Sequence, residues 1–282
     1  MFATPASSTP SVRAVPRAWM AFVGLAACAE LGEARCDEPA DGCGQPVTAD
    51  SQTVRTLRER APRYPEGAPV YLRAVTVTAV DRYDETNTGR TGTVWVQEVT
   101  PAGDATDRFA PCPLLPGGRT RVCAMSTFSP AFAPSGYRPA VGDLVDIVGG
   151  GYAEFTCATC STPFSDMNFL PQVSTPTLRR AGVAPPQVPV EVTLDDIVAH
   201  YRELMGILVT VTDVTASTDP DPRFGEMAIA GSGRSALTLA PQLTAIPDAH
   251  AGTHWDRITG VVTYFYNPKL LPRSPDDLVG QR

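Results

Sequence analysis

The residues of this sequence best suited to chemistry are its cysteines, and their spacing favours structural disulfides. Once Cys28 is set aside, six remain: Cys36, Cys43, Cys112, Cys123, Cys157 and Cys160. An even number of cysteines in an exported protein indicates disulfides, although six cysteines allow 15 pairings and sequence alone does not choose among them. The simplest pairing joins 36–43, 112–123 and 157–160, because each pair falls within one Pro- or Gly-rich loop. We therefore predict three disulfides and no unpaired thiol among the six.

The pair Cys157 and Cys160 also has the CxxC spacing of redox and zinc motifs. A thioredoxin-like motif begins a helix that follows a strand, whereas the residues around this pair indicate a β loop. A zinc site would need a second CxxC or a pair of histidines. The three histidines of the chain, at 200, 250 and 254, form no HExxH or HxH motif. A redox role remains a third functional hypothesis, and we predict no metal site and no cofactor.

Two further patterns have some features of ligand sites. Gly231-Ser232-Gly233-Arg234-Ser235 has the glycine content of a phosphate loop but lacks the Walker spacing and the following helix, so it predicts a β-turn. Asp219, Asp221, Asp276 and Asp277 could offer oxygens to calcium, but they lack the EF-hand spacing and favour solvated turns. With no nucleophile elbow or other catalytic set present, we expect a protein that is not an enzyme.

The elements that would position any site are short strands. Residues 70–99 predict a strand, a polar turn at 84–89 and a second strand, with Val75, Val77 and Ala79 on one face of the first. Further strands are predicted at 119–125, 142–149 and 169–173, and the pattern restarts at 206–216, 225–230, 235–239, 258–265 and 269–272. Five short strands with long loops in each half indicate two small Greek-key barrels of the OB type.

Short helices and linkers separate these modules. Residues 51–60 predict one or two helical turns, with Val54 and Leu57 spaced to contact a barrel. Residues 193–201 predict a second short helix with Thr193 as its N-cap. The predicted organisation is therefore a signal at 1–27, a tether at 28–63, a first barrel at 64–182, a linker with a helix at 183–202 and a second barrel at 203–282.

The N-terminal residues predict export. Arg13 and Arg17 precede a short apolar run that ends Leu25-Ala26-Ala27-Cys28, which resembles the lipobox of bacterial lipoproteins. In that family the signal is cut before the cysteine, which then carries the lipid, so Cys28 is the expected lipidation site. The alternative is an ordinary signal peptide followed by a cysteine that pairs elsewhere. We expect a protein anchored by lipid to the cell envelope, most simply the outer membrane of a Gram-negative bacterium.

The charge of the chain argues against tight nucleic-acid binding. The formal net charge is −7, and removal of residues 1–27 takes away two arginines and no acid, leaving 21 basic against 30 acidic residues, or −9. Neutralisation of phosphates supplies most of the non-specific affinity for nucleic acid. A high-affinity DNA or RNA binder is therefore not expected.

Several stretches together resemble the exported bacterial OB-fold proteins, which occur as lipoproteins and as modules beside extracellular nucleases. The stretches are GDLVDIVGG at 142–150, ELMGILVTVTDV at 203–214 and GVVTYFYNPKLLPRSPDDLV at 260–279, with TVRTLR at 53–58 and VTVTAV at 75–80. The resemblance covers most of the mature chain and implies a tandem of OB barrels.

OB barrels bind oligonucleotides and oligosaccharides on the face of strands 2 and 3 and on the loops beside it. The candidate aromatics for such a face are Tyr83, Trp95, Tyr152 and Phe155 in the first module and Trp255, Tyr264 and Tyr266 in the second. The alternative is that these rings close the barrels or pack one module on the other. We expect a non-enzymatic envelope protein that binds or scaffolds a protein or glycan partner; the alternative is a weak binder of single-stranded nucleic acid that assists an extracellular nuclease.

Overall fold

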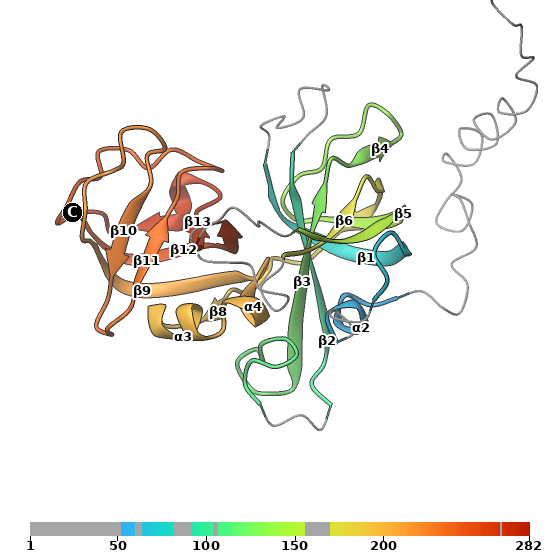
Figure 1. Ribbon diagram of the computed structural model, residues 1–282, viewed down its shortest axis with the longest axis horizontal. Coiled ribbons are helices and arrows are strands. Elements are labelled where there is room, and N and C mark those ends of the chain that lie inside the picture. Colours follow the sequence, from blue (N-terminus) through green and yellow to red (C-terminus); the bar gives the residue numbers. More distant parts are fainter. Residues whose placement is uncertain (1–51, 60–63, 82–91, 104–106, 156–169, 266) are drawn as a thin grey trace, which may run out of the picture. The chain divides into compact units, whose positions relative to one another are not determined.

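The structure, a computed structural model, describes residues 52–59, 64–81, 92–103, 107–155, 170–265 and 267–282. Within these ranges the chain forms two closed five-stranded β-barrels and a few short helices (Figure 1). The predicted all-β tandem of OB-type barrels is confirmed. The predicted signal, Cys28 and most of the tether lie outside the described residues.

Barrel 1 is built from strands β1 (Pro69–Val80), β2 (Val94–Pro101), β3 (Thr120–Phe128), β5 (Asp143–Phe155) and β6 (Leu170–Ser174). Their order around the barrel is β1-β2-β3-β6-β5, and β5 pairs again with β1 to close it. The β3–β6 pair is parallel and the others are antiparallel, as in the Greek-key order of the OB fold. All five strands were predicted.

A β-bulge in β1 corrects one detail of the predicted pattern. Val77 pairs with Val96 and Ala79 with Trp95, so Thr78 is an extra residue on β1. The bulge reverses the alternation of side chains along the strand. Val77 therefore lies in the core of barrel 1, whereas Ala79 lies outside it, in the hydrophobic cluster that includes Trp95.

Barrel 1 carries two further strands that the sequence did not predict. β7 (Thr177–Val183) pairs with the first half of β5, and β4 (Ala131–Ala133) pairs with β7. β5 bends at Gly149 and Gly150 so that its second half pairs with β6 instead. Gly150 has a φ of +86°, and a Cβ there would lie 2.8 Å from the Ser174 carbonyl oxygen, so the bend requires glycine.

Barrel 2 repeats this topology with β9 (Leu208–Ala216), β10 (Met227–Ala230), β11 (Ala236–Leu239), β12 (His254–Phe265) and β13 (Asn267–Leu271). Its order is β9-β10-β11-β13-β12, closed by the β12–β9 pair, and the β11–β13 pair is again parallel. These five strands were also predicted, whereas the short edge strands β8 (Val190–Glu191) and β14 (Leu278–Val279) were not.

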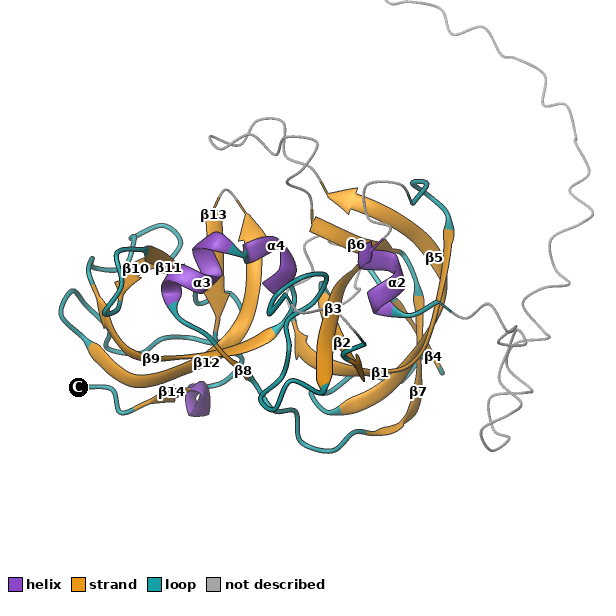
Figure 2. Cartoon of the chain, turned by 90° about the horizontal axis from the view of Figure 1, so that it is seen from below, coloured by secondary structure: helices purple, strands orange, loops and turns teal. Residues whose placement is uncertain are grey.

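A short helical segment precedes each barrel (Figure 2). α2 (Val54–Glu59) buries Val54 and Leu57 in the core of barrel 1, as predicted. α3 (Leu194–Ala199) and α4 (Tyr201–Leu204) precede barrel 2, and the short 3₁₀ helix η2 (Pro275–Asp277) lies before β14. The predicted N-cap is confirmed, since Thr193 accepts a hydrogen bond from Asp196 N while Asp196 accepts one from Thr193 N. The two barrels belong to one compact unit, residues 45–282.

Candidate functional site

The outer face of β2 and β3 in barrel 1, which is the usual ligand face of an OB barrel, is covered by barrel 2. Trp95 lies on this face, but only 2% of its surface is exposed. It packs in a hydrophobic cluster with Ala79 of barrel 1 and with Leu208, Val261 and Leu271 of barrel 2. The ring of Trp95 is therefore not available to a ligand in this arrangement.

Hydrogen bonds join the same faces. The side-chain oxygen of Gln97, which is buried on β2, accepts a hydrogen bond from Leu208 N at the start of β9. Gln242 donates to the Asp81 carboxylate at 2.8 Å. The buried side chains of Gln97 and Asp81 thus find partners on barrel 2, whereas Trp95 Nε1 and Ser126 Oγ on the same face are buried without a hydrogen-bond partner among the described residues.

The β2–β3 connection, residues 102–119, also reaches from barrel 1 into barrel 2. Phe109 is 6% exposed and belongs to the hydrophobic core of barrel 2, together with Val122 and Ala124 from β3. Beside it, Arg108 donates to the Glu191 carbonyl oxygen on β8 at 2.9 Å and lies 3.8 Å from the Asp196 carboxylate of α3. We call residues 107–123 the clamp, because they complete the core of the other barrel.

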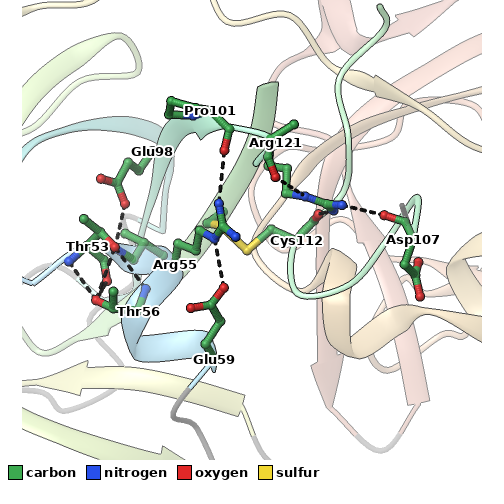
Figure 3. A network of polar contacts seen from close by, with 12 residues as sticks. Thr53, Arg55, Thr56, Glu59, Glu98, Pro101, Asp107, Cys112 and Arg121 are labelled. Atoms are coloured by element: carbon green, nitrogen blue, oxygen red, sulfur yellow. Dashed lines mark hydrogen bonds and ion pairs between the residues drawn. A yellow bond between two sulfur atoms is a disulfide. The ribbon is translucent and has the colours of Figure 1, made fainter. Parts of the chain in front are cut away.

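Figure 3 shows what holds the clamp in shape. The guanidinium of Arg121 is buried and donates to the carbonyl oxygens of Cys112 and Asp107. Burial lowers the pKa of Arg121, and the positive charge of Arg55 lowers it further. A disulfide joins Cys112 to Cys123 with a Cα–Cα distance of 5.2 Å. This confirms one of the three predicted disulfides; Cys36, Cys43, Cys157 and Cys160 lie outside the described residues.

Helix α2 provides a further link between the barrels. Arg58 donates to the carbonyl oxygens of Ala124 on β3 and Met205 before β9, both at 2.9 Å, and to that of Arg202 on α4. Burial lowers the pKa of Arg58 to about 10, and the nearby Glu203 carboxylate partly offsets this. The helix is itself held by β2, where the Glu98 carboxylate accepts from Val54 N at 2.6 Å (Figure 3).

The other predicted ligand-face aromatics are also enclosed where they are described. Tyr152 is fully buried in barrel 1, 5.1 Å from the ring of Tyr64, and Trp255 is fully buried in the core of barrel 2. Tyr264 is 3% exposed and stacks on Tyr201 of α4 at 5.0 Å. These rings pack the barrels, which was the alternative explanation for them. Tyr83, Tyr266 and the side chain of Phe155 lie outside the described residues.

The corresponding face of barrel 2 is lined by small neutral side chains. Ala228 pairs with Thr238, and Ala230 pairs with both Ala236 and Thr215. Their strand neighbours Met227, Ile229, Leu237 and Leu239 point into the core, so by alternation these residues point outward. All are partly or fully exposed. This face was missed at the sequence level because alanine and threonine carry no chemical signal.

Beside this face, the β9–β10 connection displays an aromatic ring. Phe224 is 62% exposed, and the guanidinium of Arg223 lies 5.0 Å from its ring centroid. The Asp221 carboxylate accepts from Arg223 N and Phe224 N, both at 2.9 Å, and Asp219 accepts from Ala251 N at 2.9 Å. Two of the four aspartates considered as calcium ligands, Asp219 and Asp221, therefore accept hydrogen bonds from backbone amides, and a third, Asp277, accepts from Arg273.

The glycine-rich turn at 231–235 binds an internal carboxylate. Asp195 of α3 accepts from Ser235 N at 2.8 Å and from Arg234 N at 3.4 Å. The pKa of Asp195 is lowered by hydrogen bonds, of which the one from the Ser235 hydroxyl has the largest effect and those from the two amides add to it. Residues 231–235 form the loop between β10 and β11. Two of its amides, those of Arg234 and Ser235, are engaged by Asp195.

The described residues hold no group of three or more His, Cys, Asp or Glu side chains placed to bind a metal ion. Among the same residues, no helix is both long enough and apolar enough to cross a membrane.

No protein-family model and no curated protein matches the chain. Among solved structures, the crystal structure of wild-type single-stranded DNA binding protein from Thermus aquaticus is similar, with 10% sequence identity and a TM-score of 0.27. The alignment covers 74% of this chain and 91% of that chain. At this TM-score the likeness says nothing about what the chain binds, and the strand order identifies the barrels as OB-type.

Proposed function

We propose that this protein is a non-enzymatic binding or scaffolding module of the cell envelope, anchored by lipid at Cys28, which binds a protein or glycan partner through barrel 2. The supporting observation is the outer face of β10 and β11. It is partly exposed, and its outward residues are alanines and a threonine, whereas the matching face of barrel 1 is covered.

The strands of this face lack the features of a nucleic-acid site, and the β9–β10 loop beside them adds one exposed ring, Phe224, with one arginine. Single-stranded nucleic acid is held by aromatic platforms on which bases stack and by cations that neutralise phosphates. The outward strand residues Ala228, Ala230, Ala236 and Thr238 provide neither. The described candidate rings, Trp95 and Trp255 among them, are buried. A neutral sugar or a protein surface needs no such cations.

Binding should be measured on the full chain by isothermal titration calorimetry, with single-stranded DNA, envelope glycans and envelope proteins as separate ligands. Tryptophan fluorescence would be a poor readout because Trp95 and Trp255 are enclosed. We expect binding to single-stranded DNA, if measurable, to be weaker than about 10 μM at physiological salt. A bound glycan or protein should be lost in Ala230→Arg and retained in Val99→Ala, a change at an exposed valine on β2.

Submicromolar DNA binding that falls steeply with added salt would overturn the proposal in favour of a nucleic-acid accessory. Glycan or protein binding that Ala230→Arg leaves unchanged would refute the assignment of this face.

A further inference from the structure

We infer that the molecule associates with copies of itself head to tail, with Phe224 of one copy inserted into a pocket formed by the clamp and β8 of the next. This inference extends the proposed scaffolding role but depends on different residues from the proposed partner face. It rests on three observations. The ring of Phe224 is exposed, an apolar pocket is large enough for it, and the two lie too far apart to meet within one molecule.

The turn that carries the ring of Phe224 is ordered by hydrogen bonds. Phe224 is the most exposed aromatic side chain among the described residues. Its turn is closed by the Asp221 carboxylate, by a hydrogen bond from Gly225 N to Asp221 O at 2.7 Å and by one from Asp221 N to Glu226 O at 2.7 Å. A ring presented on such an ordered turn loses little conformational entropy on binding. Aromatic and arginine side chains, here Phe224 and Arg223, are enriched where protein interfaces are tightest.

The pocket has the size and chemistry to receive a phenyl ring. It measures about 290 Å³, and its apolar lining comes from Leu114, Leu115 and Pro116 of the clamp and Val190 of β8. An apolar cavity of about 150 Å³ is large enough to bind benzene. By volume, this open pocket has room for the side chain of Phe224.

The charges at the two sites also match. Glu191 lines the pocket and is exposed, and no described residue pairs with its carboxylate. The other charged residue of the lining, Arg108, is engaged by the Glu191 carbonyl oxygen and lies near Asp196. When Phe224 enters the pocket, Arg223 beside it would meet the Glu191 carboxylate. The predicted contact thus combines an apolar anchor with one ion pair at its rim.

The ring cannot reach the pocket of its own molecule. β8 pairs with the start of β9 at Val209 and Thr210, whereas Phe224 lies in the connection that follows the end of β9 at Ala216. A strand rises about 3.3 Å per residue, so the two sites are separated by roughly 20 Å along β9. A contact between two different patches is heterologous, and it builds chains or rings rather than a two-fold dimer.

A protein pocket explains Phe224 better than a sugar does. A sugar-binding ring is accompanied by polar side chains that bond to the hydroxyl groups. The nearest polar groups here are already occupied: Asp219 and Asp221 accept from backbone amides, and the Thr218 hydroxyl accepts from Ala228 N at 2.9 Å. The ring and the guanidinium of Arg223 remain as the binding groups.

The test is sedimentation velocity of the full chain over a range of concentrations, with folding checked by circular dichroism. A contact anchored by one ring is small, so we expect a dissociation constant on the order of 100 μM. Phe224→Ala should reduce self-association at least tenfold, whereas Val99→Ala should leave it unchanged. A wild-type chain that stays monomeric at millimolar concentration, or a Phe224→Ala variant that associates as strongly as wild type, would overturn the inference.

Charge exchange makes the test specific to this pair of sites. Arg223→Glu and Glu191→Arg should each weaken association, because each places like charges at the rim, and both residues are exposed. The double variant should regain it. A mixture of Phe224→Ala, which keeps its pocket, and Glu191→Arg, which keeps its ring, should form heterodimers more readily than either variant associates with itself. Failure of the double variant to recover would refute the pairing of Arg223 with Glu191.

The assay contains no partner, so its outcome is separate from that of the proposed function. Loss of self-association in Phe224→Ala with partner binding retained would support both proposals. Self-association without any partner binding would leave the inference standing and refute the proposed function.

Discussion

The ring of Phe109 stacks on the imidazole of His200, with centroids 4.2 Å apart and planes inclined by 18°. Phe109 belongs to the β2–β3 connection of barrel 1, and His200 lies at the junction of α3 and α4, before barrel 2. The contact ties the two halves of the protein together.

Removal of this ring should destabilise the whole molecule. Phe109→Ala should lower the free energy of unfolding by about 3–5 kcal/mol, because it leaves a cavity in the core of barrel 2. Urea unfolding followed by circular dichroism would measure the loss. Val99→Ala is the control, since an exposed side chain on β2 should change stability by about 0.5 kcal/mol or less. An effect of Phe109→Ala as small as the control would show that the clamp does not contribute to the fold.

The disulfide between Cys112 and Cys123 should stabilise the folded protein, because it restricts the conformations of the unfolded chain. Cys112 and Cys123 are 11 residues apart, and closing a loop of that length is worth about 3 kcal/mol. Replacing both cysteines with serine should lower stability by that order. The loss should be smaller when Phe109 is already alanine, because the two changes release the same loop. Strictly additive losses would indicate that the disulfide and the ring act independently.

Acid stability should depend on Asp195. Hydrogen bonds from Ser235 and Arg234 lower the pKa of Asp195 in the folded protein. The unfolded state therefore binds this proton more tightly, and the stabilisation is present above the unfolded value near pH 4 and is lost as the pH falls through the folded pKa. Asp195→Asn should flatten the dependence of stability on pH below about pH 4. Urea unfolding between pH 2.5 and 6 would measure it, with Asp276→Asn as an exposed control. If the free energy of unfolding of Asp195→Asn fell with pH as steeply as that of the wild type, the hydrogen bonds to Asp195 would not be a source of the acid dependence.

Anchoring at Cys28 can be tested directly. Because the apolar run ends in Leu25-Ala26-Ala27-Cys28, metabolic labelling with a fatty-acid analogue should mark the wild-type chain and not Cys28→Ala. Equal labelling of both chains would rule out a lipid on this cysteine.

The strands were predictable because period-2 patterns in residues such as Val75, Val77, Val209 and Val211 reflect backbone geometry. The short strands β4, β7, β8 and β14 were missed, since two to seven residues without clear alternation carry little pattern. The contact between the barrels was predicted only as the alternative explanation for the candidate aromatics. An outward aromatic such as Trp95 has the same sequence signature whether it faces a ligand or a neighbouring domain. The structure shows the contact most clearly in β3, where residues 121–127 are all buried and both faces of the strand are therefore covered.

Because Phe109 lies in the core of barrel 2, the second barrel is not an independent folding unit. A fragment that begins at residue 203 would contain every strand of the second closed barrel, yet it would lack Phe109, Val122 and Ala124 from its hydrophobic core. In the order of synthesis these three side chains are made before the strands they complete. The first barrel can thus act as a covalently attached folding template for the second. Duplication or exchange of a single barrel would leave a cavity in the hydrophobic core where these three side chains pack.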